Sequence, residues 1–271
     1  MHKTLLVFDI ETVVDTKAAR NLLNDYESAE ELIEEKLANY HLQITDGKNS
    51  FARQLFHKVV AISYLEAAIL PGENGTEVYE IKELKSGGEL DFTEEQLIKG
   101  FFDKLNRNLP RLVTFNGKTF DLPVLKYRAM LYDIPCRGLH RSGDKWNSYS
   151  NRYSMDWHCD LIEAFSDYGA SAKVKMNEVC ALFGIPGKLD VDGSQVSVMF
   201  KEGKLKEIRD YCELDVTSTY LLYLKYQLHT GYLTKGNYDK AVDDLTLFLS
   251  ERVDTKANFV LFLEAWERLA A

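Results

Sequence analysis

Two acids interrupt the apolar run near the N-terminus, and this interruption most constrains how the chain can fold. In "LLVFDIETVV", residues 5–14, the segment from Leu5 to Phe8 is typical of a strand covered on both faces, and Asp9 and Glu11 follow it. Side chains two residues apart on a strand point to the same side, so these carboxylates would repel each other. A divalent cation with oxygen ligands would relieve the repulsion. The alternative is a strand that ends at Phe8, with both acids in a solvated turn.

Apolar periodicity and turn residues predict an α/β fold for the rest of the chain. The expected order of strand, strand, strand, helix, strand and helix predicts a mixed sheet with helices on its faces. A hairpin around "PGENG" is expected because Gly72, Asn74 and Gly75 accept positive φ. In chain order, we expect one or two surface helices inserted within about residues 16–56, hairpin strands "KVVAISYLEAAIL" and "TEVYEIKEL", a helix opened by a capping box from Thr93 to Gln96, a strand "RLVTF", a helix with Pro123 in its first turn, a loop over 136–158, helices from Asp160 and within "KMNEVCALFGI", an exposed turn over 187–196, one long helix from Lys204 to His229, and two helices within 237–271.

Composition limits the kind of protein this chain can be. With 271 residues, of which 45% are apolar, it can bury a substantial core. No apolar run approaches the roughly 18 residues of a membrane span, and Asp9 comes too early for a secretory signal, so we expect a cytoplasmic protein with no membrane partner. The cysteines lie far apart with no C-x-x-C pair, which indicates buried thiols and not disulfides or a zinc site: Cys136, Cys159, Cys180 and Cys212.

The net charge of −9 argues against a protein that coats nucleic acid nonspecifically, because that mode depends on many Lys and Arg contacts to phosphate. It leaves open an enzyme that holds metal ions with acids and guides a strand with a local basic patch. In the loop 136–158, basic and aromatic residues alternate: Arg137, Arg141, Lys145 and Arg152 with Trp146, Tyr149, Tyr153 and Trp157. These side chains could contact phosphates and stack on bases, or form an ordinary solvated loop with a few anchoring rings.

Further acids occur where strands end and where helices carry an inward face. In "TFNGKTFDLP", Asp121 follows a strand and a glycine turn, close to the start of a helix. In "IRDYCELDVTSTYLL", Tyr211 and Asp215 are four residues apart, so a helix places them on one face, one turn from each other. The chain has 15 tyrosines, and this is its only Tyr-x-x-x-Asp. Asp160 is interpreted as a helix cap and not as a metal ligand.

Three of these segments, "FDIET", "NGKTFD" and "YCELD", resemble in this order the three exonuclease motifs of the DEDD superfamily, in the subgroup whose third motif is Tyr-x-x-x-Asp. The wider sequence, including "HCDL", "GIPGK" and "DGSQV", is similar to stand-alone predicted 3′-5′ exonucleases related to the proofreading domain of family B DNA polymerases. The resemblance implies an α/β, ribonuclease H-like mixed sheet flanked by helices. We therefore expect an exonuclease domain over 1–229, with the helical insertion at about 16–56, and a helical C-terminal extension over 230–271 packed on the same domain.

The resemblance also implies roles for individual residues. Asp9 would bridge two divalent ions, Glu11 and Asp215 would complete the first, and Asp121 would support the second, partly through water. Tyr211 would hold the attacking water. Within the middle motif, Asn116 and Phe120 are candidate substrate contacts, although Asn116 could simply occupy a positive-φ turn with Gly117.

The chemistry expected of such a site is hydrolysis of phosphodiester bonds at a single-stranded 3′ end, with release of nucleoside monophosphates. Two Mg²⁺ or Mn²⁺ ions roughly 3.5–4 Å apart would make water more acidic and steady the leaving oxygen. Hard ions of this kind prefer carboxylates to Cys or His, and the candidate ligands are all carboxylates. The alternatives are a nucleic-acid-binding module of the same fold that has lost turnover, and an enzyme that acts on another phosphate ester such as a nucleotide.

Overall fold

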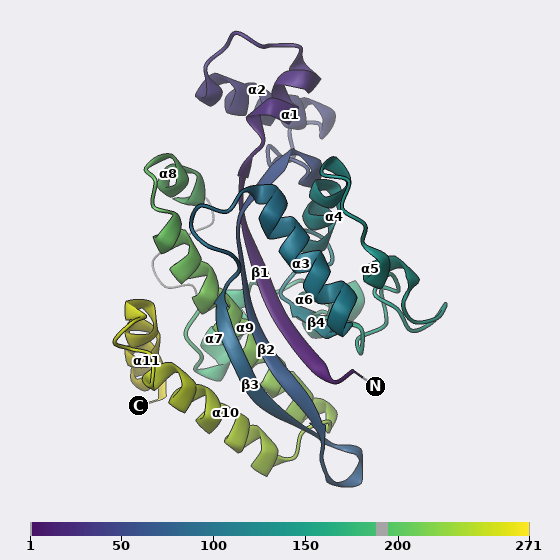
Figure 1. Ribbon diagram of the computed structural model, residues 1–271, viewed down its shortest axis with the longest axis vertical. Coiled ribbons are helices and arrows are strands. Elements are labelled where there is room, and N and C mark those ends of the chain that lie inside the picture. The colour runs from purple at the N-terminus through teal and green to yellow at the C-terminus, as the bar shows by residue number, and fades with distance from the viewer. Residues whose placement is uncertain (1, 188–194, 271) are drawn as a thin grey trace.

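The computed structural model describes residues 2–187 and 195–270, and its centre is a mixed five-stranded sheet in the order β3-β2-β1-β4-β5. The middle strand β1 pairs antiparallel with β2 and parallel with β4, while β5 continues parallel beyond β4. The strands are β1 (Thr4–Val14), β2 (His57–Pro71), β3 (Glu77–Ser86), β4 (Arg111–Thr114) and β5 (His158–Asp160). This order, with helices on both faces (Figure 1), confirms the predicted ribonuclease H-like α/β sheet.

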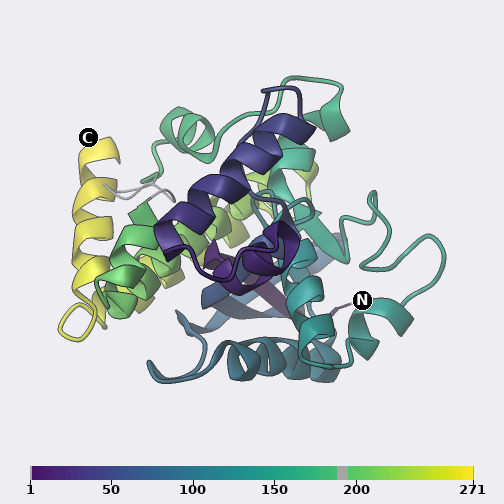
Figure 2. The ribbon, with the colours of Figure 1, turned by 90° about the horizontal axis from the view of Figure 1, so that it is seen from above.

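Helices cover each face of the sheet because its central strand is apolar on both sides. Leu5 and Val7 of β1 pack into the core beneath α9, whereas Leu6 and Phe8 pack into the core beneath α3 and α4. Figure 2 shows α3 and α9 on opposite sides of the sheet. The first core lies under α6 (Leu161–Phe165), α7 (Met176–Phe183), α9 (Leu205–Thr230), α10 (Lys235–Ser250) and α11 (Ala257–Ala270), with α8 (Val196–Lys201) beside α9, and the second lies under α3 (Glu94–Asn108), α4 (Asp121–Leu131) and α5 (Arg137–Arg141).

The helical insertion projects from the end of the sheet at which β1 finishes (Figure 1). It consists of α1 (Thr16–Leu23) and α2 (Glu30–Ile44), which pack on each other through Ala19, Ile33 and Leu37. The described residues also form short 3₁₀ turns, among them η1 (Gln54–Phe56), η2 (Glu73–Gly75) and η3 (Asp167–Gly169). Among the described residues, no helix is long and apolar enough to cross a membrane.

Most of the expected elements are present, and the differences are local. The capping box from Thr93 to Gln96 opens α3 as predicted. In the hairpin, Asn74 and Gly75 have positive φ, but the prediction for Gly72 is wrong, because its φ is −97°. The expected loop over 136–158 contains the short helix α5 and runs into the unpredicted strand β5. Most of the turn expected over 187–196 lies outside the described residues, and the last of these positions, Val196, begins α8 and is buried.

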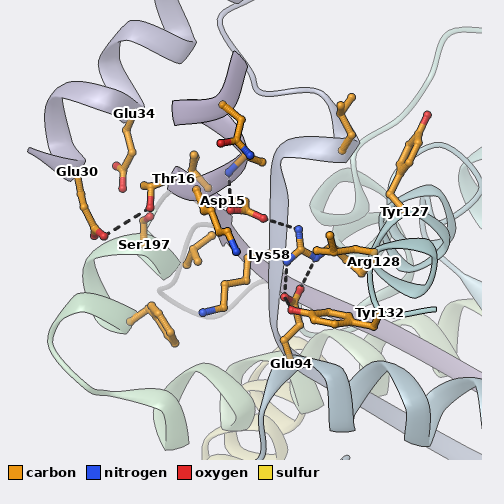
Figure 3. A pocket seen from close by; sticks show the side chains of 18 of the residues that line it. Asp15, Thr16, Glu30, Glu34, Lys58, Glu94, Tyr127, Arg128, Tyr132 and Ser197 are labelled. Carbon is orange, nitrogen blue, oxygen red and sulfur yellow. Dashed lines mark hydrogen bonds and ion pairs between the residues drawn. The ribbon is translucent and has the colours of Figure 1, made fainter. Parts of the chain in front are cut away.

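A buried ion network joins the end of β1 to the helices on the α4 face (Figure 3). The Arg128 guanidinium on α4 donates to Glu94 at 2.7 and 2.5 Å and to Asp15 at 2.5 Å. Asp15 also caps α1, and Glu94 accepts from the Val59 backbone N–H at 2.6 Å and from the Tyr132 hydroxyl at 2.7 Å. One arginine therefore holds strand, insertion and two helices in a fixed relation.

Arg128→Met should destabilise the protein by about 3–5 kcal/mol, because it leaves the carboxylates of Glu94 and Asp15 buried without their cation. Urea unfolding measures this loss. Arg107→Met is the matched control, since Arg107 is exposed at the end of α3 and forms no ion pair within residues 2–187 or 195–270. A loss no greater than that of the control would contradict the role given to the network.

Candidate active site

The two acids of the first motif lie inside β1 and not after it. Strand pairing continues past Asp9 and Glu11 to Val14, so the alternative of a strand ending at Phe8 is wrong. Glu11 is only 7% exposed. The carboxylates of both acids and the Cys212 thiol on α9 each offer an atom within 4.8 Å of the others. The acids therefore face α9, on one side of the sheet.

A β-bulge immediately follows these acids. Glu11 pairs with Ala61, but Thr12 pairs with Val59, so the register shifts between Glu11 and Thr12. A bulge bends a strand and re-aims its side chains, and such irregularities are frequent beside active sites. The Thr12 hydroxyl meets the His57 ring at 2.9 Å, which fixes the strand just after the bend.

Asp121 is brought to β1 by the start of α4. Its side chain accepts a hydrogen bond from the Ile10 backbone N–H at 3.2 Å, between the two acids of the first motif. Asp121 is 4% exposed, and burial raises its pKa well above the usual range, with the negative charge of Asp9 as the next contribution. An acid held this way favours a proton or a cation nearby.

The third motif lies on α9, where Tyr211 and Asp215 are both buried one turn apart. Between them, the Cys212 thiol lies 3.7 Å from an Asp9 carboxylate oxygen and 3.6 Å from the Asp9 carbonyl oxygen. Burial raises the pKa of Cys212 well above its usual value, and the charges of Asp9, Glu11 and Asp215 add to this. The thiol therefore lies against the two acids of β1, and its raised pKa favours the protonated form in the metal-free protein.

Asp160 stabilises the glycine turn before Asp121 through hydrogen bonds to its backbone. Asn116 has a φ of 74°, as expected for the turn, and a side chain at Gly117 would overlap Thr114 at 2.5 Å. Asp160 accepts the backbone N–H groups of Asn116 at 2.7 Å and Lys118 at 2.8 Å. It also caps α6 through the Ile162 N–H at 3.3 Å, so its interpretation as a cap is confirmed.

The candidate substrate contacts of the middle motif are both engaged with the protein itself. The Asn116 side-chain oxygen accepts from the Thr119 hydroxyl at 2.6 Å. Phe120 lies against the rings of His57 and Phe51, with centroids 4.9 and 5.8 Å apart. These contacts give both residues a structural role at the junction of the insertion and α4.

The donor set fits a hard divalent cation. Glu11 and Asp121 are buried and Asp9 is half-buried, and both burial and the charge of Asp9 raise the pKa of Asp121. Cys212 adds a sulfur atom to the cluster, and hard ions prefer carboxylate oxygens to sulfur. The residues that could hold such an ion are the acids Asp9, Glu11, Asp121 and Asp215.

Sequence reasoning missed two contributors to this region. Cys212 was expected only as a buried thiol, although its place between Tyr211 and Asp215 on the inward face of a helix put it among the acids. The turn-holding role of Asp160 had no signal, because it depends on a strand of three residues, β5, that lies beside β4.

The family comparison agrees with the motifs. A model for "predicted 3′-5′ exonuclease related to the exonuclease domain of PolB" matches residues 49–266, most of the chain. The chain belongs to this family. The matched range includes Asp121, Tyr211 and Asp215, and it begins after Asp9 and Glu11.

Other comparisons add little to this assignment. A solved family B DNA polymerase from the hyperthermophilic archaeon Pyrobaculum calidifontis matches 93% of this chain with 17% identity and a TM-score of 0.46. The chain spans 29% of the length of that polymerase. No curated protein matches the sequence.

Asp121→Asn should raise the free energy of unfolding of the metal-free protein at neutral pH, by on the order of 1 kcal/mol. The amide keeps an acceptor for the Ile10 N–H but removes a buried negative charge beside Asp9. Because the carboxyl has a raised pKa in the folded state, its ionised form costs stability, so the gain from Asn shrinks as the pH falls and Asp121 becomes protonated.

Urea unfolding in a chelator at several pH values measures this gain. Asp243→Asn serves as the control, since Asp243 is exposed on α10. A variant that is no more stable than the control at neutral pH would show that repulsion in the cluster is small.

Proposed function

We propose that the protein is a metal-dependent 3′-5′ exonuclease that acts on single-stranded nucleic acid and releases nucleoside monophosphates. One observation carries the proposal: Asp9 and Glu11 of β1 lie within 4.8 Å of each other and of the Cys212 thiol on α9, and the acid that begins α4 accepts a hydrogen bond from the same stretch of β1. Carboxylates held close together at a partly buried site favour a bound cation, which offsets the repulsion between their charges. The family assignment supplies the reaction class.

Within this proposal, Asp9 is the central ligand, because it lies next to Glu11, Asp121 and Cys212 at once. Glu11 belongs to the same strand as Asp9, Asp215 belongs to α9, and Asp121 begins α4. Divalent ions such as Mg²⁺ or Mn²⁺, when bound there, would acidify water and neutralise phosphate charge. The carboxylates of the chain would bind these ions and fix their positions.

Tyr211 is assigned to orient the attacking water. It is buried on α9, one turn from Asp215, so its hydroxyl is carried by the same rigid element as a metal-holding acid. Cys212 is a positioning residue in this account, because its thiol contacts both the carboxylate and the carbonyl of Asp9. Neither residue is needed to hold the ions.

Asp9→Ala should reduce nucleotide release at least about 100-fold, since it removes the acid shared by the whole cluster and with it several kcal/mol of charge stabilisation. Release of nucleotides from a labelled single strand with Mn²⁺ or Mg²⁺ measures the rate. Asp243→Ala, on the exposed side of α10, is the matched control and should keep full activity. Wild-type protein that binds the strand without cleaving it would identify the silent binding module instead.

Tyr211→Phe should slow the reaction by about tenfold to 100-fold while leaving the metal-induced rise in Tm unchanged, because it removes an orienting hydroxyl and no carboxylate. The rate and the Mn²⁺-dependent thermal shift are measured on the same preparations. A variant with wild-type turnover would make Tyr211 a core residue only. A lost thermal shift would place it in metal binding.

A further inference from the structure

A basic pocket of about 460 Å³ opens beside the turn that leads to Asp121. Its volume lies in the range of roughly 300–1,000 Å³ that is usual for ligand clefts. The polar groups around it come from five separate segments of the chain. Its charged side chains and its one histidine are Lys118, Lys126, His140, Arg152, Glu163 and Lys173.

The charge of this pocket is unlike that of the rest of the protein. Four cationic side chains line it against one acid, in a chain whose net charge is −9. That acid, Glu163, is already bound by the Arg152 guanidinium at 2.7 and 2.9 Å. The larger pocket of about 1110 Å³ in Figure 3 differs, because its lining has four acids and four cations, several of them paired with one another.

Within the described residues, the lysines of the basic pocket form no ion pairs with acids. Lys118 donates to the Arg152 backbone carbonyl at 2.6 Å, which holds its ammonium group in place without neutralising it. In the described parts of the chain, neither Lys126 on α4 nor Lys173 before α7 forms an ion pair. These cations come from separate elements and face the same pocket. Such an excess of positive charge favours an anionic ligand.

The position of the pocket links it to the proposed reaction. Lys118 and Thr119 belong to the turn before Asp121, and Leu122 follows that acid, so the pocket borders the start of α4. Asp160 holds the same turn through the Lys118 N–H. A chain of phosphates that ends at the acid cluster could pass along this border.

We propose that the basic pocket binds the phosphodiester backbone of the single strand, at nucleotides upstream of the one being removed. The inference rests on the proposed function and names where the substrate lies. A nucleic-acid backbone with several phosphates fits better than a single phosphate, because the cations come from several segments of the chain.

The double variant Lys126→Glu/Lys173→Glu tests this. Fluorescence anisotropy of a labelled oligodeoxythymidylate, measured in a chelator so that no cleavage occurs, gives the affinity at several salt concentrations. We expect about tenfold weaker binding near physiological salt, and a salt slope smaller by about 1.4, since each lost phosphate contact on a single strand contributes about 0.7. Turnover of an oligonucleotide should show the same change in KM and little change in kcat.

The control is Lys3→Glu/Lys240→Glu, which makes the same change in net charge at the start of β1 and on the exposed side of α10. A second readout is hydrolysis of the p-nitrophenyl ester of thymidine 5′-monophosphate, which carries no upstream phosphate and should be cleaved equally by wild-type and variant protein. Equal melting temperatures show that the variants fold.

Affinity and salt slope equal to those of the control would overturn the inference, and so would an absence of oligonucleotide binding by wild-type protein. An equal loss on the mononucleotide ester would also overturn it, because the lysines would then act in the chemistry itself. Binding is measured without turnover, so wild-type protein that binds through these lysines but cleaves nothing would end the proposed function and leave the basic pocket as a binding site for the strand.

Discussion

Repulsion among closely spaced carboxylates is the constraint on which the rest of the structure depends. Asp9 and Glu11 lie in the middle strand of a sheet, where Glu11 is buried and Asp9 half-buried, and Asp121 has its pKa raised by burial and by Asp9. A fold tolerates such a cluster only if rigid elements hold each acid in place. Here the holders are a strand paired on both sides and the starts and faces of helices that pack on it. A bound metal ion would offset the repulsion between the carboxylates and supply the positive charge that the reaction needs.

Two contacts hold α4 against β1 and so define one wall of the candidate site. The Ile10 backbone N–H donates to Asp121 at the first residue of the helix, and Arg128, seven residues later, binds Asp15 beyond the end of the strand. Seven residues are close to two turns, so both contacts come from one side of α4. The same arginine network anchors the helical insertion, which therefore cannot shift without disturbing the wall.

The sequence predicted the parts of the site that depend on local spacing. The alternation of Asp9 and Glu11 and the helical spacing of Tyr211 and Asp215 could be read directly, and the family resemblance put them together with Asp121. Contacts that depend on tertiary placement could not be read. A strand of only three residues carries no periodicity, so β5 and the support that Asp160 gives the turn were missed. The pairing of Arg128 with Glu94 and Asp15 joins segments far apart in sequence and left no pattern.

The most direct test of the central claim is a crystal structure of the protein grown with Mn²⁺, with anomalous scattering used to locate the metal. The account predicts anomalous peaks in contact with the Asp9 carboxylate, bounded by Glu11, Asp121 and Asp215. Carboxylates that remain together without any peak at saturating Mn²⁺, or a peak held elsewhere that does not touch Asp9, would contradict it.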